Sequence, residues 1–132
     1  MLFTIDGEPR GKQRPRFTVR GGYAHEYTPT ETVEYQRKVK AAFYAAGGYK
    51  LYGPVKVEVW AFCKIPKSKS TKAAEAMTGK PADKKPDADN VLKIVLDGLN
   101  GEAYDDDKQV TEAIVHKCYW PDGRVVVDVQ GV

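Results

Sequence analysis

The sequence predicts an α+β domain, with a mixed sheet of about four strands and roughly two or three helices beside it. Runs of alternating apolar residues near both ends and in the middle of the chain are typical of strands. Between them lie segments with apolar residues three or four positions apart, which is typical of amphipathic helices. Because 132 residues suit one compact core, we expect a single domain over residues 1–132.

The N-terminal part of the chain predicts a strand, a basic loop and a helix. Leu2–Asp6 alternates in the manner of a strand and stops at Gly7, and the glycine and prolines around GKQRPRF predict a loop. Thr28 is expected to cap a helix that has Pro29 in its first turn. This helix runs through ETVEYQRKVKAAFYAA and ends at the Gly47-Gly48 pair.

The middle and the C-terminal part predict further strands. Pro54 opens VKVEVWAFCKIP, whose two faces both become apolar, as in a central strand. Ser70–Met77 predicts a short helix or a mobile segment. Val110–Trp120 predicts another long strand, and the turn PDGR then leads into Val125–Val129, its expected hairpin partner.

A helix is also expected inside KPDADNVLKIVLDGLN, with Asp89 as its N-cap, Asn90 opening it and Gly101 just beyond its end. Its buried stripe is predicted to comprise Val91, Leu92, Val95, Leu96 and Leu99. Asp89, Lys93 and Asp97 lie at i, i+4 and i+8 and line another face. A solvated polar face with two spaced ion pairs is the plainest interpretation of these three residues.

Composition narrows the classes of protein. No apolar stretch is long enough to cross a bilayer and the N-terminus has no signal-peptide pattern, so we expect a cytoplasmic protein without membrane contact. Cys63 and Cys118 lack a CxxC spacing and are expected to be reduced thiols. His25 and His116 are isolated, which argues against a zinc site.

The net charge of +3 hides an uneven distribution. Residues 10–40 contain eight basic and three acidic side chains, whereas residues 97–107 contain five acidic side chains and no lysine or arginine. A basic surface around an acidic pocket suits a polyanion whose phosphates must approach a metal ion.

Two acidic segments predict that metal ion. Asp87 and Asp89 are two residues apart and, if extended, project to the same side, while YDDDKQV returns toward the start of the helix or its polar face. Gathered carboxylates repel one another and need a cation. Oxygen ligands without histidine or cysteine favour Mg²⁺ or Mn²⁺. An EF-hand is disfavoured because Val91 and Leu92 occupy positions that a calcium loop gives to Asp or Asn and to Gly, and no Walker spacing occurs.

The segments KQRPR, PDADNVLKIVLDGLNG and YDDDKQV together resemble the RusA family of Holliday junction resolvases, small phage-associated endonucleases, over nearly the whole chain. The resemblance implies a divalent-metal-dependent dimer that cuts four-way DNA junctions. It places the family's essential acids on Asp87, Asp89 and Asp107, its catalytic lysine on Lys93 and its supporting acid on Asp97. Asp106, a close neighbour of Asp107, is a further candidate for a supporting role.

We therefore expect Asp87, Asp89 and Asp107 to bind Mg²⁺, with Mn²⁺ as a possible substitute, and Lys93 to place its charge on the scissile phosphate or the leaving group. The expected DNA contacts are Lys12, Arg14, Arg16, Lys84 and Lys85.

The predicted activity is resolution of four-way junctions by paired symmetric cuts, in DNA recombination and repair. Because the chain holds one acidic constellation and two strands must be cut, a C2 homodimer is expected, through Val55–Phe62 or Val125–Val129. Two alternatives remain: a non-catalytic DNA-binding module whose acids cap a helix, and a metal nuclease for flaps or other branched DNA.

Overall fold

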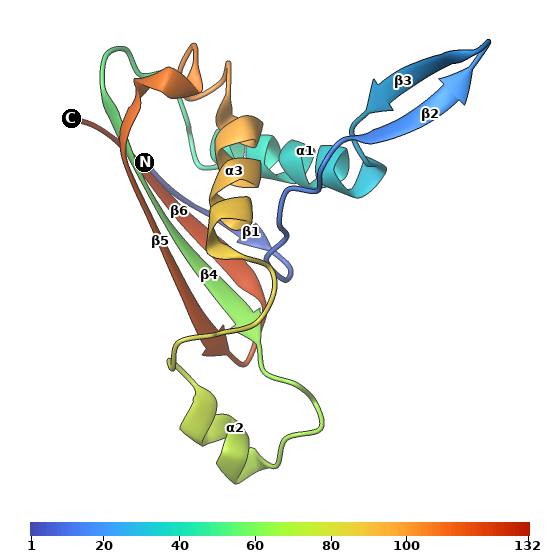
Figure 1. Ribbon diagram of the computed structural model, residues 1–132. Helices are drawn as coiled ribbons and strands as arrows, with labels where there is room; N and C mark the ends of the chain where they lie inside the picture. The colour runs from blue at the N-terminus through green and yellow to red at the C-terminus, as the bar shows by residue number, and fades with distance from the viewer.

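Four strands form a mixed sheet in the order β1-β6-β4-β5 in the computed structural model, which describes residues 1–132 (Figure 1). The strands are β1 (Leu2–Asp6), β4 (Val55–Lys64), β5 (Val110–Trp120) and β6 (Arg124–Gly131). β6 pairs antiparallel with both β1 and β4, and β4 pairs parallel with β5. The predicted α+β class, the mixed four-stranded sheet and the interior position of β4 are confirmed.

The predicted hairpin between Val110–Trp120 and Val125–Val129 is wrong, because β6 lies on the far side of β4 from β5. Neighbouring strands are about 4.8 Å apart, so the connection through residues 121–123 must span about 10 Å, which three extended residues reach. Val125, Val127 and Val129 are completely buried. An interior position in the sheet buries these valines, and this outweighs the local preference for a hairpin.

Two long helices, α1 (Thr30–Ala45) and α3 (Ala88–Leu99), pack on each other and on one face of the sheet (Figure 1). Their apolar side chains meet the inward valines of β4 and β6 in one core; α1 contributes Tyr35, Val39 and Phe43, and α3 contributes Val91, Ile94, Val95 and Leu99. A short helix, α2 (Thr71–Met77), is capped by Ser70, whose hydroxyl accepts a hydrogen bond from the Ala73 N–H at 3.2 Å. No helix has both the length and the apolar character that a membrane span requires.

The opposite face of the sheet carries partly exposed aromatic side chains. Along β4 the residues alternate between fully buried and partly exposed, so Trp60 and Phe62 lie on the face away from the core. Trp60 stacks on His116 with ring centroids 5.7 Å apart, and the Arg124 guanidinium lies 5.0 Å from the Phe62 ring centre. We call this surface the open sheet face, comprising Trp60, Phe62, His116, Trp120 and Val126.

Both predicted helix caps are displaced. α1 has Pro29 as its N-cap, one residue after Thr28, and no side chain caps it. α3 begins at Ala88 with Asp87 as its N-cap, so Asp89 lies in the first helical turn and is not the cap. Alanine has the highest helix propensity, which favours the earlier start. The expected extended geometry of Asp87 and Asp89 is therefore wrong.

A hairpin, which was not predicted, begins at the end of the predicted GKQRPRF loop and continues through residues to which no element was assigned. It consists of β2 (Arg16–Arg20) and β3 (Tyr23–Tyr27), joined by Gly21 and Gly22 at φ 59° and 82°. Two consecutive positive φ values are typical of a tight type I′ turn, for which glycine is suited. Every residue of both strands is exposed, and the hairpin projects away from the sheet (Figure 1).

Candidate active site

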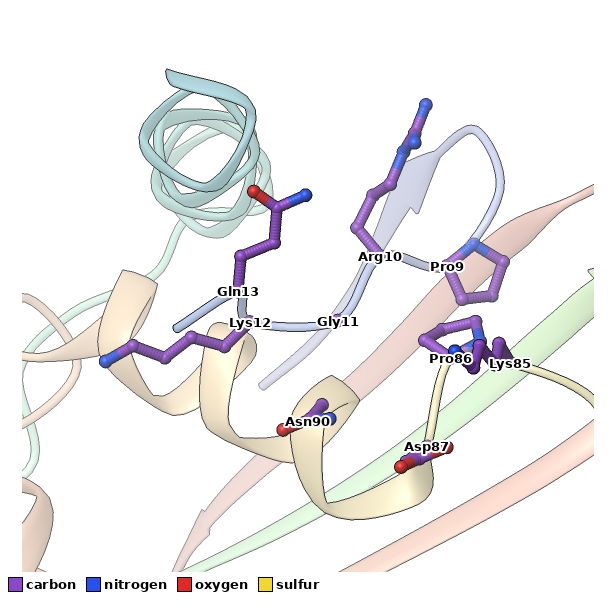
Figure 2. A pocket seen from close by; sticks show the side chains of 9 residues that line it. All are labelled: Pro9, Arg10, Gly11, Lys12, Gln13, Lys85, Pro86, Asp87 and Asn90. Atoms are coloured by element: carbon purple, nitrogen blue, oxygen red, sulfur yellow. The ribbon is translucent and has the colours of Figure 1, made fainter. Parts of the chain in front are cut away.

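The basic loop before the hairpin lies across the first turn of α3 and forms one wall of an open pocket (Figure 2). The Lys12 backbone N–H donates to the Asn90 carbonyl oxygen at 3.0 Å and fixes the loop there. A Cβ at Gly11 would lie 3.0 Å from the Pro86 Cβ and 3.1 Å from the Asn90 Cβ, so glycine permits this close approach. The pocket has a volume of about 560 Å³ and is lined by Pro9, Arg10, Gly11, Lys12, Gln13, Lys85, Pro86, Asp87 and Asn90.

The carboxylates of Asp87 and Asp89 are free of partners within the chain. Neither side chain makes a hydrogen bond or an ion pair, and Asp87 does not use its carboxylate to cap α3. Helix positions two residues apart do not face each other. The structure accordingly contains no group of three or more histidine, cysteine, aspartate or glutamate side chains that could hold a metal ion.

Lys93 connects the polar face of α3 to the second acidic run. Its Nζ lies 3.0 Å from Asp97 Oδ1 and 3.3 Å from Asp107 Oδ2, so Asp107 reaches the helix face as expected. The hydrogen bond to Asp97 raises the pKa of Lys93, partial burial opposes the rise, and Asp107 adds to it. The Lys93 ammonium is thereby held protonated beside two carboxylates.

Asp97 also holds the basic loop. The Lys12 Nζ donates to Asp97 Oδ2 at 2.5 Å, so one carboxylate receives an ammonium group from each side. Asp97 is largely covered, with 18% of its side chain exposed, which favours persistent ion pairs over solvated ones. The carboxylate therefore holds both Lys93 on the polar face of α3 and Lys12, which lines the pocket.

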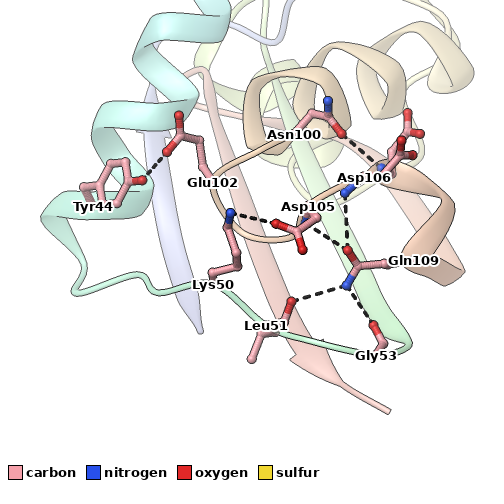
Figure 3. A network of polar contacts seen from close by, with 10 residues as sticks. Tyr44, Lys50, Leu51, Gly53, Asn100, Glu102, Asp105, Asp106 and Gln109 are labelled. Carbon is pink, nitrogen blue, oxygen red and sulfur yellow. Dashed lines mark hydrogen bonds and ion pairs between the residues drawn. The ribbon is translucent and has the colours of Figure 1, made fainter.

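The second acidic run is held mainly by hydrogen bonds between side chains and backbone groups (Figure 3). Asp106 caps the short 3-10 helix Asp107–Gln109 by accepting from the Lys108 N–H at 2.9 Å, and this hydrogen bond lowers its pKa. Gln109 Oε1 accepts from the Asp105 and Asp106 N–H groups, and Gln109 Nε2 donates to the Leu51 and Gly53 carbonyls.

The remaining acids of this run point to different partners. The Asp105 carboxylate pairs with Lys50 at 2.8 Å, and the Asp107 N–H donates to Asn100 Oδ1 at 3.0 Å. Of the three consecutive aspartates, only Asp107 directs its carboxylate to Lys93. The turn thus directs the carboxylate of Asp107 to a different partner from those of Asp105 and Asp106.

The predicted DNA contacts occupy varied positions. Lys12 and Lys85 line the pocket, and Arg16 is the first residue of β2. Arg14 is exposed, and the carbonyl of Lys84 accepts from Lys117 Nζ at 2.5 Å. Arg10, Gln13 and Asn90 also line the pocket, and none of them was predicted as a site residue. Arg10 could have been predicted because it belongs to the basic stretch. The sequence contains no pattern that would identify Gln13 and Asn90 as pocket residues.

Unpaired carboxylates beside several cations, on a mixed sheet with one helical layer, are compatible with a protein that acts on a phosphodiester. The comparisons with known proteins identify the family. Residues 6–130 match the model of the family described as Endodeoxyribonuclease RusA, and the chain belongs to this family. Membership indicates an endonuclease that resolves Holliday junctions. The chain is also 35% identical over 139 residues to the uncharacterized protein YqaN of Bacillus subtilis (strain 168), an alignment that covers 98% of this chain and 95% of YqaN.

Proposed function

We propose that this protein is a metal-dependent endonuclease that resolves four-way DNA junctions by paired, symmetric phosphodiester hydrolysis, in DNA recombination and repair. The observation that carries the proposal is the pair of partnerless carboxylates, Asp87 and Asp89, at the start of α3 beside a basic pocket. Both carboxylates are exposed and make no ion pair within the chain, so they are free to take up an external cation. Family membership supplies the reaction class.

The donor types of the three predicted ligands suit a hard divalent cation, although the structure does not gather these carboxylates into one cluster. Asp87, Asp89 and Asp107 offer only carboxylate oxygens, which suit Mg²⁺ and its possible substitute Mn²⁺. When bound, such an ion supplies a Lewis acid that activates water and stabilises the negative charge of the leaving oxygen. The Asp107 carboxylate also forms an ion pair with Lys93 at 3.3 Å, so one proposed metal ligand contacts the lysine.

Lys93 supplies a fixed positive charge. Its ammonium, protonated and held by Asp97 and Asp107, stabilises charge that develops on the scissile phosphate or the leaving oxygen. Asp97 is a positioning residue in this account, because it orients Lys93 and Lys12 without touching the substrate.

The basic residues hold the DNA backbone. Arg14, Arg16, Lys84 and Lys85 offer donors to phosphate oxygens, and the planar guanidinium groups can bind two oxygens at once. Lys12 is tied to Asp97 and contributes charge from the pocket wall.

Two symmetric cuts require two active sites, so we propose a C2 homodimer. Val55, Val57, Val59 and the inward valines of β6 are fully buried and are not available to a partner. Of the two strands predicted to form the interface, the residues on the open sheet face, such as Trp60, Phe62 and Val126, remain available to a partner. Mixing wild type with excess Asp89→Asn should then yield heterodimers that nick one strand and release few resolved duplexes.

The deciding experiment compares cleavage of four-way, flap and linear DNA in Mg²⁺ under identical conditions. We expect paired cuts at matching positions in the four-way junction and little cutting of linear duplex. If flaps are cut faster than four-way junctions, the preferred substrate is another kind of branched DNA. Binding without cutting in either Mg²⁺ or Mn²⁺ would support a non-catalytic DNA-binding module.

A further inference from the structure

The β2–β3 hairpin has two chemically different faces. Side chains of directly paired residues lie on the same side of a two-stranded ribbon, and alternate residues lie on opposite sides. The pairs Arg16/Tyr27, Thr18/His25 and Arg20/Tyr23 therefore share one side, which we call the arginine-tyrosine face. The pairs Phe17/Glu26 and Val19/Ala24 share the other side, the apolar face.

The arginine-tyrosine face is complementary to a polyanion. It carries Arg16 and Arg20 and no carboxylate, because Glu26, the one acid of the hairpin, lies on the apolar face. An open hollow of about 520 Å³ on the arginine-tyrosine face is lined by Thr18, Arg20, His25 and Tyr27. Hydroxyl and guanidinium groups are among those that contact phosphates and base edges in DNA.

The hairpin starts at the wall of the active-site pocket. Gln13 lines the pocket and its N–H donates to Thr32 Oγ1 at 3.4 Å, and β2 begins at Arg16. Strands of five residues extend about 17 Å at 3.4 Å per residue. A DNA strand rises about 3.4 Å per nucleotide, so the hairpin reaches about five nucleotides from the pocket.

We propose that the β2–β3 hairpin is a DNA-binding arm that inserts its arginine-tyrosine face into the major groove of the duplex beside the cut site. The major groove is wide enough for a two-stranded ribbon. An isolated two-stranded ribbon is only marginally stable in water, so contact with DNA would also stabilise the arm. This inference rests on the proposed function and adds the position of the flanking duplex.

A second copy of the chain is the less suitable occupant. The apolar face offers two large apolar side chains, Phe17 and Val19, next to the charged Glu26. A stable protein interface buries roughly 800 Å² per partner, far more than two side chains supply.

The test compares two double variants of the hairpin, Arg16→Ala/Arg20→Ala on the arginine-tyrosine face and Phe17→Ser/Val19→Thr on the apolar face. All four side chains are exposed, so both variants should fold. Affinity for a four-way junction is measured over a salt series in EDTA, so that no cleavage occurs. We expect the arginine variant to bind at least about tenfold more weakly with a salt slope reduced by about two, and the control variant to bind as wild type.

If the arginine variant binds the junction with wild-type affinity and wild-type salt slope, the hairpin is not a DNA-binding arm. Loss of binding in the Phe17/Val19 variant together with conversion of a dimer to a monomer in sedimentation would overturn the proposal too, by assigning the hairpin to a second copy. This test measures binding without cleavage, so it addresses only the DNA-binding role of the hairpin. The proposed function fails separately, if the wild type does not cut the junction in Mg²⁺.

Discussion

Two acidic segments of this protein look alike in sequence and differ in structure. At the start of α3, Asp87 and Asp89 have no partner in the chain, whereas in the turn Asp105–Gln109 nearly every polar group has one. Asp106 serves as a backbone cap and Asp105 pairs with Lys50. Carboxylates that are satisfied internally serve stability, and those left unpaired beside a basic pocket are available for chemistry.

Asp107 belongs to both segments. Its backbone N–H is held by Asn100 as part of the turn, and its carboxylate lies against Lys93 on the polar face of α3. The rigid turn therefore positions a functional carboxylate, which explains why a network of structural hydrogen bonds lies next to the proposed active site.

The largest effect is expected from removing a free carboxylate. Asp89→Asn should lower single-turnover cleavage of a four-way junction by about a thousandfold, because losing a metal ligand removes several kcal/mol of charge stabilisation in the transition state. Junction binding should be retained or tighter, since one negative charge near phosphate is gone. Asp105→Asn is the matched control and should cut within about twofold of wild type. Similar cleavage rates for Asp89→Asn and Asp105→Asn would show that the two acidic segments do not differ in function.

The next effect concerns the turn. Gln109→Ala removes hydrogen bonds to four backbone groups and should lower the free energy of unfolding by about 1–3 kcal/mol. Thermal unfolding should show a melting temperature lower by about 4 °C for each kcal/mol. Gln130→Ala, which removes an exposed contact to Asp128, is the control and should leave the melting temperature nearly unchanged. An unchanged melting temperature in Gln109→Ala would show that these hydrogen bonds do not stabilise the fold.

A smaller effect is expected at the loop that covers α3. Gly11→Ala places a methyl group 3.0 Å from the Pro86 Cβ and should cost about 1–2 kcal/mol while displacing the pocket wall. Gly131→Ala meets no atom within 4 Å and serves as the control. Chemical denaturation of the two variants measures the difference, and equal stability would show that the loop yields without cost.

The smallest expected effect is on the titration of Lys93. Its pKa is raised, so the ammonium and the stabilisation it contributes are fully present below the ordinary lysine pKa of about 10.4 and are lost as the pH rises through the higher folded value. Asp97→Asn should move the pKa of Lys93 downward, because the main cause of the rise is removed. NMR titration of the Lys93 side chain measures this shift, and an unchanged pKa would contradict the pairing.

Much of the fold was predictable because the decisive signals are periodic. Alternation predicted β1, β4 and β5, and the apolar stripe predicted α3. The stripe missed Ile94 as a buried residue and included Leu92 and Leu96, which are only partly buried. The hairpin was missed because all its residues are exposed and no buried alternation marks it; Gly21-Gly22 between β-prone runs was the available signal. The partner of β6 depends on burial of three valines between distant strands, which local turn preferences do not encode.

The candidate site was predictable in its chemistry and less so in its geometry. The acids, Lys93 and Asp97 follow from residue type and helical spacing, and the structure brings Asp107 to Lys93. The cap on α3 was placed two residues too late, so the expected convergence of Asp87 and Asp89 failed. Asp106 was expected only to support the site, and its role as the cap of the 3-10 helix depends on a backbone hydrogen bond that sequence spacing does not reveal.

The central claim is that the free acids of α3, together with Asp107, bind the divalent ion. Calorimetric titration of Mn²⁺ into the DNA-free wild type, Asp89→Asn and Asp105→Asn tests it most directly. We expect wild type and Asp105→Asn to bind Mn²⁺ alike, and Asp89→Asn to bind at least about tenfold more weakly. Equal Mn²⁺ binding by Asp89→Asn and wild type would contradict the account.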